Sequence, residues 1–180
     1  MTALTLLGIA GALRQESTNR KLIREAARAF GPATFIEADL ALPLYDGDQE
    51  ESAGIPEAVQ RLADQIAAAD AVVISTPEYN KGPSGVLKNA LDWVSRTASN
   101  PWADRPVAVM SSAAGRAGGE RAQMVLRGFL TPFQPCLLTG PELHVADCRK
   151  QFDAEGRLIS DRYAATLETL MQKLRAEIRA

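Results

Sequence analysis

The strongest constraint on the fold is a regular alternation of short apolar runs with segments that carry apolar residues at helical spacing. Residues 3–9 and 71–75 are nearly continuous apolar runs, as expected for parallel strands that are covered on both faces. Between such runs the apolar residues recur every three or four positions. Val59, Leu62 and Ile66 are one example, and this spacing predicts helices that bury one face.

Five strand–helix units can be followed along the chain. Further strands are predicted at 34–36, at 107–110 after Pro106, and at 135–138, the last either ending there or resuming at 143–145. We read residues 37–55 as a loop that passes through Pro43, Tyr45 and Gly47. The pattern predicts an α/β fold, a doubly wound five-stranded parallel sheet with helices on both faces, in one domain over residues 1–180.

Composition and charge narrow the classes of partner. The formal net charge of −2 gives no support for nucleic acid or an anionic membrane as partner, and a small molecule is expected instead. The apolar N-terminal stretch lacks the basic run of a signal peptide, and no apolar run approaches the ~20 residues needed to span a bilayer. Cys136 and Cys148 match no metal spacing, and we expect reduced thiols in a cytoplasmic protein.

Three loops are predicted to form the functional site. Ligands of open parallel sheets bind beyond the carboxyl ends of the strands, near the switch point of the strand order. That rule selects residues 10–19, 76–83 and 111–119. All three segments carry residues that are unusual for simple connections, including a Gly-rich stretch in the third.

The first of these loops is a candidate anion site. It joins a strand to a helix start and offers Arg14, the hydroxyls of Ser17 and Thr18, and the amide of Asn19. Free N–H groups and the helix dipole favour negative charge at such a position, although Ser17 or Thr18 could equally be a simple N-cap. The segment lacks the Gly-Lys-Ser/Thr ending of a Walker loop and the glycines of a dinucleotide fingerprint. It suits a terminal phosphate monoester.

The second loop carries a resemblance to a known family. Residues 76–93 read TPEYNKGPSGVLKNALDW, which contains P-E-Y-N followed by G-x-L-K-N-A-x-D-W. This stretch resembles the NADPH-dependent FMN reductase family, in particular its quinone and chromate reductase branch. The family's first-loop pattern meets Gly11, Arg14, Ser17, Asn19 and Leu22. Its third-loop pattern, which follows Ser111 or Ser112, meets Gly115, Gly118, Gly119, Arg121, Ala122 and Gln123. The resemblance covers essentially the whole chain.

The resemblance implies a flavodoxin-like sheet of order 2-1-3-4-5, FMN as cofactor and NADPH or NADH as electron donor. Hydride chemistry would be carried by FMN at its N5 atom, with no catalytic side chain and no metal. The implied cofactor contacts are assigned by loop. Those to the phosphate are Arg14, Ser17 and Asn19; those along the isoalloxazine are Pro77, Glu78, Tyr79 and Asn80; those from the third loop are Ser111, Gly115 and Arg116.

For several residues, a structural role is the alternative to a role in binding or chemistry. The family usually has serine where this chain has Ala12, so we expect weaker retention of FMN. Glu78 is interpreted mainly as a loop-shaping residue, and Tyr79 as a stacking, hydrogen-bonding or dimer-contact residue. Residues 88–93 are expected to fix a helix and a subunit interface, and His144 to be structural.

The resulting hypothesis is an enzyme that uses a ping-pong route. NAD(P)H would reduce the flavin and leave, and a quinone, an azo compound, a metal oxyanion such as chromate or free flavin would then take its place. A homodimer or homotetramer is expected. A non-catalytic flavodoxin-like electron carrier is the alternative, disfavoured by the near-neutral charge. A phospho-receiver domain fails because the end of the first strand lacks clustered acids.

Overall fold

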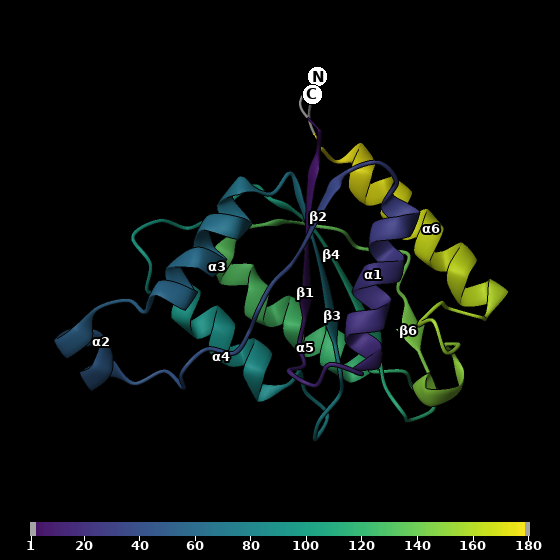
Figure 1. The fold of residues 1–180 in the computed structure, drawn as a ribbon, viewed down its shortest axis with the longest axis horizontal. Coiled ribbons are helices and arrows are strands. Elements are labelled where there is room, and N and C mark those ends of the chain that lie inside the picture. Colours follow the sequence, from purple (N-terminus) through teal and green to yellow (C-terminus); the bar gives the residue numbers. More distant parts are fainter. Residues whose placement is uncertain (1–2, 179–180) are drawn as a thin grey trace.

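A parallel sheet of strand order β2-β1-β3-β4-β5 forms the centre of the computed structural model, which describes residues 3–178 (Figure 1). The predicted fold class and strand order are confirmed. The bounds of the strands are β1 Thr5–Ala10, β2 Thr34–Glu37, β3 Ala71–Thr76, β4 Pro106–Ser112, β5 Cys136–Leu137 and β6 His144–Val145. The bounds of the longer helices are α1 Thr18–Phe30, α3 Glu57–Ala68, α4 Gly85–Val94, α5 Glu120–Leu130 and α6 Asp161–Ala176.

Side-chain alternation along the strands divides the core into two layers. Leu7 and Ile9 of β1 belong to the cluster under α3, α4 and α5, whereas Leu6 points to the cluster under α1 and α6. Figure 1 shows the two groups of helices on opposite sides of the sheet. Because both faces are covered, β3 and β4 are buried along their whole length, which explains their continuous apolar runs.

The fifth position of the sheet is shared by two short strands. β5 pairs with the start of β4 at Pro106 and Val107, and β6 pairs with its end at Ser111 and Ser112. The residues between them include a cis peptide bond before Pro141. The alternative in which the last strand resumes at 143–145 therefore matches the structure, and the resumed part extends the sheet at its carboxyl edge.

The segment after β2 differs from the expectation of a plain loop. It contains helix α2, Gly47–Ala53, which is capped by the Asp46 side chain and ends at Gly54. None of the α2 residues is buried, and the helix projects from the body of the molecule (Figure 1). The sequence carries no periodic signal for α2, because a seven-residue helix without a buried face has no apolar stripe.

Within residues 3–178 no helix combines the length and apolar character needed to cross a membrane.

Candidate functional site

The carboxyl ends of β1, β3 and β4 bring the three predicted loops to one edge of the sheet, at the lower end of Figure 1. Gly11 joins the first two loops, because its N–H donates to the Ser75 carbonyl (2.8 Å) and its carbonyl accepts from Ser84 Oγ (2.7 Å). A Cβ on Gly11 would lie 3.0 Å from that Oγ and 3.3 Å from Pro77 Cδ. The two loops thus meet without space for a side chain.

Asn19 fastens the first loop to the two central strands. Its Oδ1 accepts from Ser75 Oγ (2.7 Å) and from the Ser112 N–H (3.1 Å), and its Nδ2 donates to the Ser112 carbonyl (3.0 Å). The side chain is 2% exposed. The resemblance implies a phosphate contact for Asn19, and in the structure its side-chain amide is hydrogen-bonded inside the protein.

The start of α1 remains the anion-binding feature of the first loop. The Ser17 N–H donates to the Arg14 carbonyl (3.1 Å), which turns the chain into the helix, and Ser17 Oγ accepts from the Asn19 N–H (3.3 Å) as N-cap. Arg14 is exposed and donates one bond to the Glu16 carbonyl (3.0 Å). The dipole of a 13-residue helix and a guanidinium group therefore converge on the same edge.

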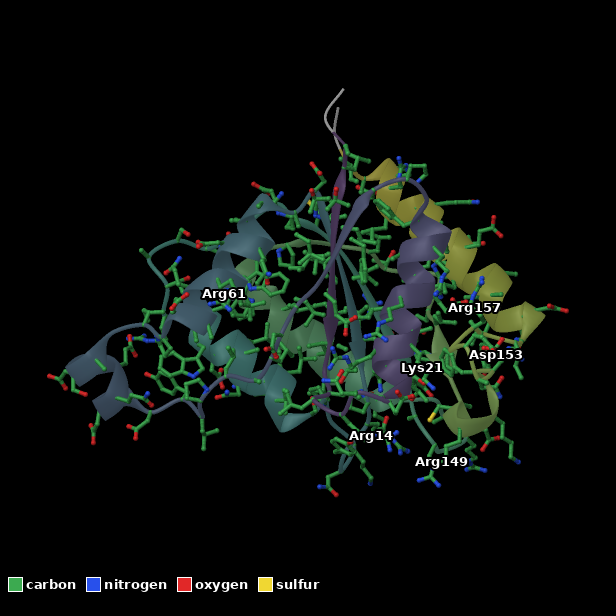
Figure 2. The ribbon with its side chains drawn as sticks, in the orientation of Figure 1. Arg14, Lys21, Arg61, Arg149, Asp153 and Arg157 are labelled. Atoms are coloured by element: carbon green, nitrogen blue, oxygen red, sulfur yellow. The ribbon has the colours of Figure 1, made fainter. Side chains whose placement is uncertain are left out.

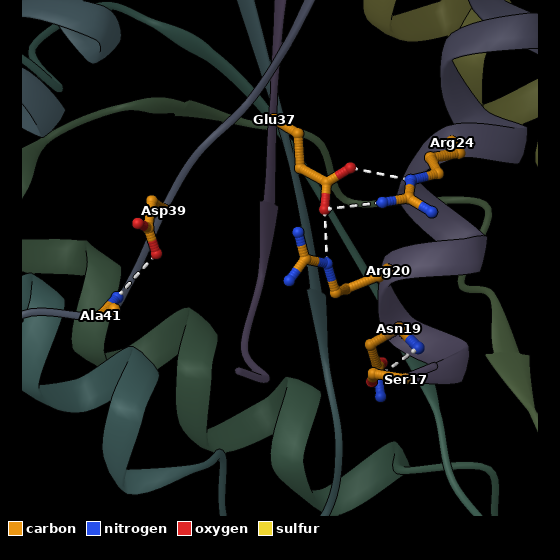
Figure 3. A network of polar contacts seen from close by, with 7 residues as sticks. All are labelled: Ser17, Asn19, Arg20, Arg24, Glu37, Asp39 and Ala41. Atoms are coloured by element: carbon orange, nitrogen blue, oxygen red, sulfur yellow. Dashed lines mark hydrogen bonds and ion pairs between the residues drawn. The ribbon is translucent and has the colours of Figure 1, made fainter. Parts of the chain in front are cut away.

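Arg20, although it lies in the first turn of α1, is already paired. Its Nε donates to Glu37 Oε1 (2.6 Å) at the end of β2, and Arg24 Nε donates to the other carboxylate oxygen (2.8 Å), as Figure 3 shows. This network ties α1 to β2. It also leaves Arg14 as the exposed cation of the first loop.

The second loop is a tight hairpin. The N–H of Tyr79 donates to the Gly82 carbonyl (2.9 Å) and that of Gly82 to the Tyr79 carbonyl (3.0 Å). Asn80 and Lys81 between them both have positive φ, at 51° and 66°, as in a two-residue turn of type I′. Pro77 is buried at the base of the hairpin, whereas the Tyr79 side chain is 64% exposed at its tip.

Glu78 links this hairpin to the third loop. Its Oε2 accepts from the backbone N–H of Ala122 (3.3 Å) in the first turn of α5. The N-cap of α5 is Gly119, which has no side chain to cap the helix. Glu78 takes over that function from another loop, as a negative charge at a helix N-terminus is favourable. This contact agrees with the interpretation of Glu78 as a loop-shaping residue.

Two glycines determine the path of the third loop. A Cβ on Gly118 would lie 2.6 Å from the backbone of His144, and one on Gly119 would lie 2.7 Å from Ser111 Cβ. Both glycines have positive φ, at 60° and 94°. Ser111 lies beneath the loop, fully buried, where its Oγ donates to the Gly118 carbonyl (2.6 Å) and accepts from Gln123 Nε2 (2.8 Å).

The exposed part of the third loop is formed by other residues. Gly115 and Arg116 face solvent, and a Cβ on Gly115 would meet nothing within 4 Å. The sequence therefore identified the exposed members of this loop, while Ser111 supports them from below. Gln123, which belongs to the third-loop pattern of the family, is part of this support through its bond to Ser111.

A fourth segment also reaches this edge of the sheet, and sequence reasoning missed it. Residues 146–151 follow β6, and the Cys148 N–H donates to the Ala113 carbonyl (3.2 Å) at the start of the third loop. The buried side chain of Cys148 anchors a short turn whose next two residues, Arg149 and Lys150, are exposed. The strand predicted at 143–145, which the structure has as β6, is the sequence signal that brings this segment to the edge of the sheet.

The segment after β2, residues 39–55, is held beside the site by α4. We call it the arm. Trp93 Nε1 donates to the Pro43 carbonyl (2.8 Å), and the Tyr45 ring packs edge-on against Trp93 with centroids 5.0 Å apart. Asn89 donates to the same carbonyl (2.9 Å) and accepts from the Tyr45 N–H (2.8 Å). The K-N-A-x-D-W block thus fixes the arm as well as its own helix.

An ion pair holds the outer part of the arm. Arg96 Nε donates to Glu50 Oε2 (2.9 Å), and the Tyr45 hydroxyl donates to the same carboxylate (3.0 Å). The hydrogen bond from Arg96 lowers the pKa of Glu50 below its usual 4.5, with the bond from Tyr45 adding to the effect. The hydrogen bond to Glu50 raises the pKa of the Tyr45 hydroxyl.

The donors at this edge fit a flat ring that carries a phosphate. The start of α1 and Arg14 offer N–H groups to an anion, and the backbone of the two other loops borders the open edge beside it. Figure 2 shows Arg14 at the end of the molecule where the strands terminate. FMN, with an isoalloxazine ring and a terminal phosphate monoester, has the chemistry that this set of groups can hold.

Comparison with known proteins gives the same answer. The family model for NADPH-dependent FMN reductases matches residues 4–148. An NAD(P)H-dependent FMN reductase of Pseudomonas aeruginosa is 40% identical over 176 residues, which cover 97% of this chain and 95% of that protein. A 2-hydroxy-1,4-benzoquinone reductase of a Burkholderia species is 36% identical over 180 residues, with coverage of 98% and 97%.

A solved structure agrees in fold as well. The flavoenzyme FerB of Paracoccus denitrificans, an NAD(P)H:(acceptor) oxidoreductase, superposes with a TM-score of 0.86 at 30% identity and covers 97% of both chains. The resemblance found in the three loops therefore extends over the sequence and the fold together. The chain belongs to the NADPH-dependent FMN reductase family.

Proposed function

We propose that the protein is an NAD(P)H-dependent FMN-containing reductase that passes two electrons to quinones and similar acceptors. The observation that carries the proposal is the meeting of the α1 N-terminus, the 77–82 hairpin and the 113–119 loop at one edge of the sheet. When bound, FMN supplies the redox chemistry, because its ring takes up hydride and returns the electrons to an acceptor. The protein supplies binding, orientation and electrostatics.

Each loop has a distinct part in holding FMN. Arg14, Ser17 and the first N–H groups of α1 are proposed to bind the phosphate, with Asn19 keeping that loop in place. Pro77, Glu78, Tyr79 and Asn80 would border the ring, and Gly115 and Arg116 would approach it from the third loop over the support of Ser111. Ala12 has no hydroxyl group, unlike the serine that the family usually has at this position. Backbone N–H groups would have to take the place of that hydroxyl, and FMN would be bound less tightly.

The open edge suits two small molecules in turn. Tyr79 at the tip of the hairpin is largely exposed, so its ring stands at the border of the open edge. We propose a ping-pong route in which NAD(P)H leaves before a quinone, an azo compound, a metal oxyanion such as chromate or free flavin enters. Among these acceptors, quinones and free flavin have the most support, because the similar proteins are named as FMN and quinone reductases.

The proposal includes a homodimer or homotetramer in the cytoplasm. Large apolar side chains stand exposed near the site, with Leu44 of the arm 81% exposed, Met124 of α5 74% and Tyr79 64%. Exposed large apolar side chains of this kind are the groups that a subunit contact would bury. The projecting arm, which buries no α2 residue in one chain, would gain contacts in such an assembly.

Initial-rate kinetics test the proposed function. The FMN-loaded protein is assayed with NADPH and 1,4-benzoquinone, each varied at several fixed concentrations of the other. The proposal predicts parallel double-reciprocal lines, because the two substrates never occupy the site together. Intersecting lines would contradict the ping-pong route, and an absence of quinone-dependent NADPH oxidation would contradict the enzyme assignment and favour an electron carrier.

A further inference from the structure

The edge of the sheet that carries the site has opposite charges at its two ends. On the side of β2, the arm and its helix α2 include Asp46, Asp48, Glu50 and Glu51, and residues 38–60 contain no lysine or arginine. On the side of β6, the turn after Cys148 presents cations. In the common orientation of Figures 1 and 2, α2 lies at the lower left and Arg149 at the lower right. A phosphate-bearing ligand that extends along this edge is repelled at one end and attracted at the other.

At the cationic end of this edge, hydrogen bonds hold the backbone of the turn in place, while its charged side chains are exposed. The Ala113 N–H donates to the Val145 carbonyl (3.0 Å), the Cys148 N–H to the Ala113 carbonyl (3.2 Å), and the Ala146 N–H to the Tyr163 hydroxyl (3.2 Å). The turn is therefore held against the third loop, which carries Arg116. Cys148 is 7% exposed and anchors it from inside.

The charges of this turn have no partner in the part of the chain that the structure describes. Eight lysines and arginines there form ion pairs, and Arg116, Arg149 and Lys150 are not among them. All three are exposed. The turn 146–151 contains one acidic residue, Asp147, and residues 113–119 contain none, so the three cations of these two segments leave an excess of positive charge. An unpaired guanidinium beside an ammonium is a recognition pair for phosphate.

We propose that Arg149 and Lys150 bind the 2′-phosphate of NADPH and so favour NADPH over NADH, with Arg116 adding positive charge beside them. This inference rests on the proposed function, since it names the donor of that same site. The phosphate of FMN is assigned to the start of α1, which leaves the donor as the second anion. A donor whose nicotinamide lies over the 77–82 and 113–119 loops must extend its adenosine end along the edge, and the acidic arm disfavours the other direction.

The test uses the FMN-loaded protein and its Arg149→Ala/Lys150→Ala variant. Binding of 2′,5′-ADP and of 5′-AMP is measured by titration calorimetry, because the two probes differ in the 2′-phosphate. We expect the Kd for 2′,5′-ADP to rise about tenfold in the variant, as for the loss of charge-assisted contacts, with 5′-AMP unchanged. Lys173→Ala, an exposed lysine in the last turn of α6, is the matched control and should change neither.

Kinetics give an independent reading. In the double variant the ratio of kcat/KM for NADPH to that for NADH should fall by about the same factor of ten. An equal loss of kcat/KM for NADPH and for NADH would show that the cations attract both donors through their charge alone, which would overturn the proposal. An unchanged Kd for 2′,5′-ADP in the variant would overturn it as well. Weaker retention of FMN with unchanged 2′,5′-ADP binding would assign them to the phosphate of FMN and overturn it too.

Failure of the proposed function is separable from failure of this inference. If the parent protein binds FMN but oxidises neither NADPH nor NADH, the proposed function fails. The binding of 2′,5′-ADP still decides whether the cations recognise a 2′-phosphate.

Discussion

At the scale of single residues, Ser17 combines two roles that one experiment can separate. Its Oγ caps α1 by accepting from the Asn19 N–H, and its hydroxyl is proposed to donate to the phosphate of FMN. Ser160 caps α6 in the same way, far from the site along the chain. We predict that Ser17→Ala weakens FMN binding roughly tenfold, because a hydrogen bond to a charged group is lost.

The matched control is Ser160→Ala, which removes an N-cap and should lower the free energy of unfolding by about 1 kcal/mol without changing FMN affinity. Quenching of flavin fluorescence on titration of the apoprotein measures the affinity. Equal FMN affinity in both variants would show that Ser17 is only a cap.

The third loop offers a second residue-scale comparison, between two of its glycines. Gly118 has positive φ and would place a Cβ 2.6 Å from the His144 backbone, whereas Gly115 has open space. We predict that Gly118→Ala lowers the free energy of unfolding by about 2 kcal/mol or more and weakens FMN binding, because the loop must move. Gly115→Ala should stay within about 0.5 kcal/mol of the parent. Urea denaturation of the apoproteins measures both, and similar stability of the two variants would contradict this view of the loop.

Asn19 and Ser111 show what the sequence could not reveal at this scale. Both lie in predicted site loops, yet the partners of Asn19 are distant in sequence, whereas those of Ser111 lie 7 and 12 positions away on the third loop and α5. Ser75 lies 56 positions from Asn19 and Ser112 lies 93 positions away. Only the folded sheet shows that these polar groups satisfy each other. The sequence could therefore predict where the polar residues gather but not which of them face a ligand.

At the scale of elements, the strands and long helices were predictable and α2 was not. Strand β3 was predictable because burial on both faces requires a continuous apolar run. Helix α1 was predictable because it buries one stripe of apolar residues. Helix α2 buries nothing, so its contacts to the rest of the chain come from polar groups such as Glu50. The turn after β6, residues 146–151, was not predicted to join the site for a related reason, since it has no repeating apolar pattern of its own.

The arm is expected to respond to pH through Glu50. The hydrogen bond from Arg96 stabilises the charged carboxylate form of Glu50, so the pKa of Glu50 in the folded protein lies below the usual 4.5. A lowered pKa means that the contact stabilises the arm fully above pH 4.5 and is lost as pH falls through the folded-state value. We predict that Arg96→Ala raises the pKa of Glu50 toward 4.5, as measured by an NMR titration of the carboxyl carbon.

A suitable control for this titration is Arg61→Ala, which breaks the Glu57 pair on α3 and should leave Glu50 unchanged. A parent protein in which Glu50 already titrates at its usual value would contradict the assignment of this ion pair as the anchor of the arm.

At the scale of the whole molecule, the fold and the family agree with a flavin reductase, and the three loops whose order and spacing the sequence displays lie together at one edge of the sheet. The central claim is that these loops bind FMN and that NAD(P)H reduces it there. The most direct measurement is the absorbance spectrum of the purified protein, supplied with FMN, before and after NADPH is added without oxygen. The proposal predicts a bound flavin spectrum that bleaches within seconds. Flavin that does not bind, or that binds and stays oxidised with both NADPH and NADH, would contradict it.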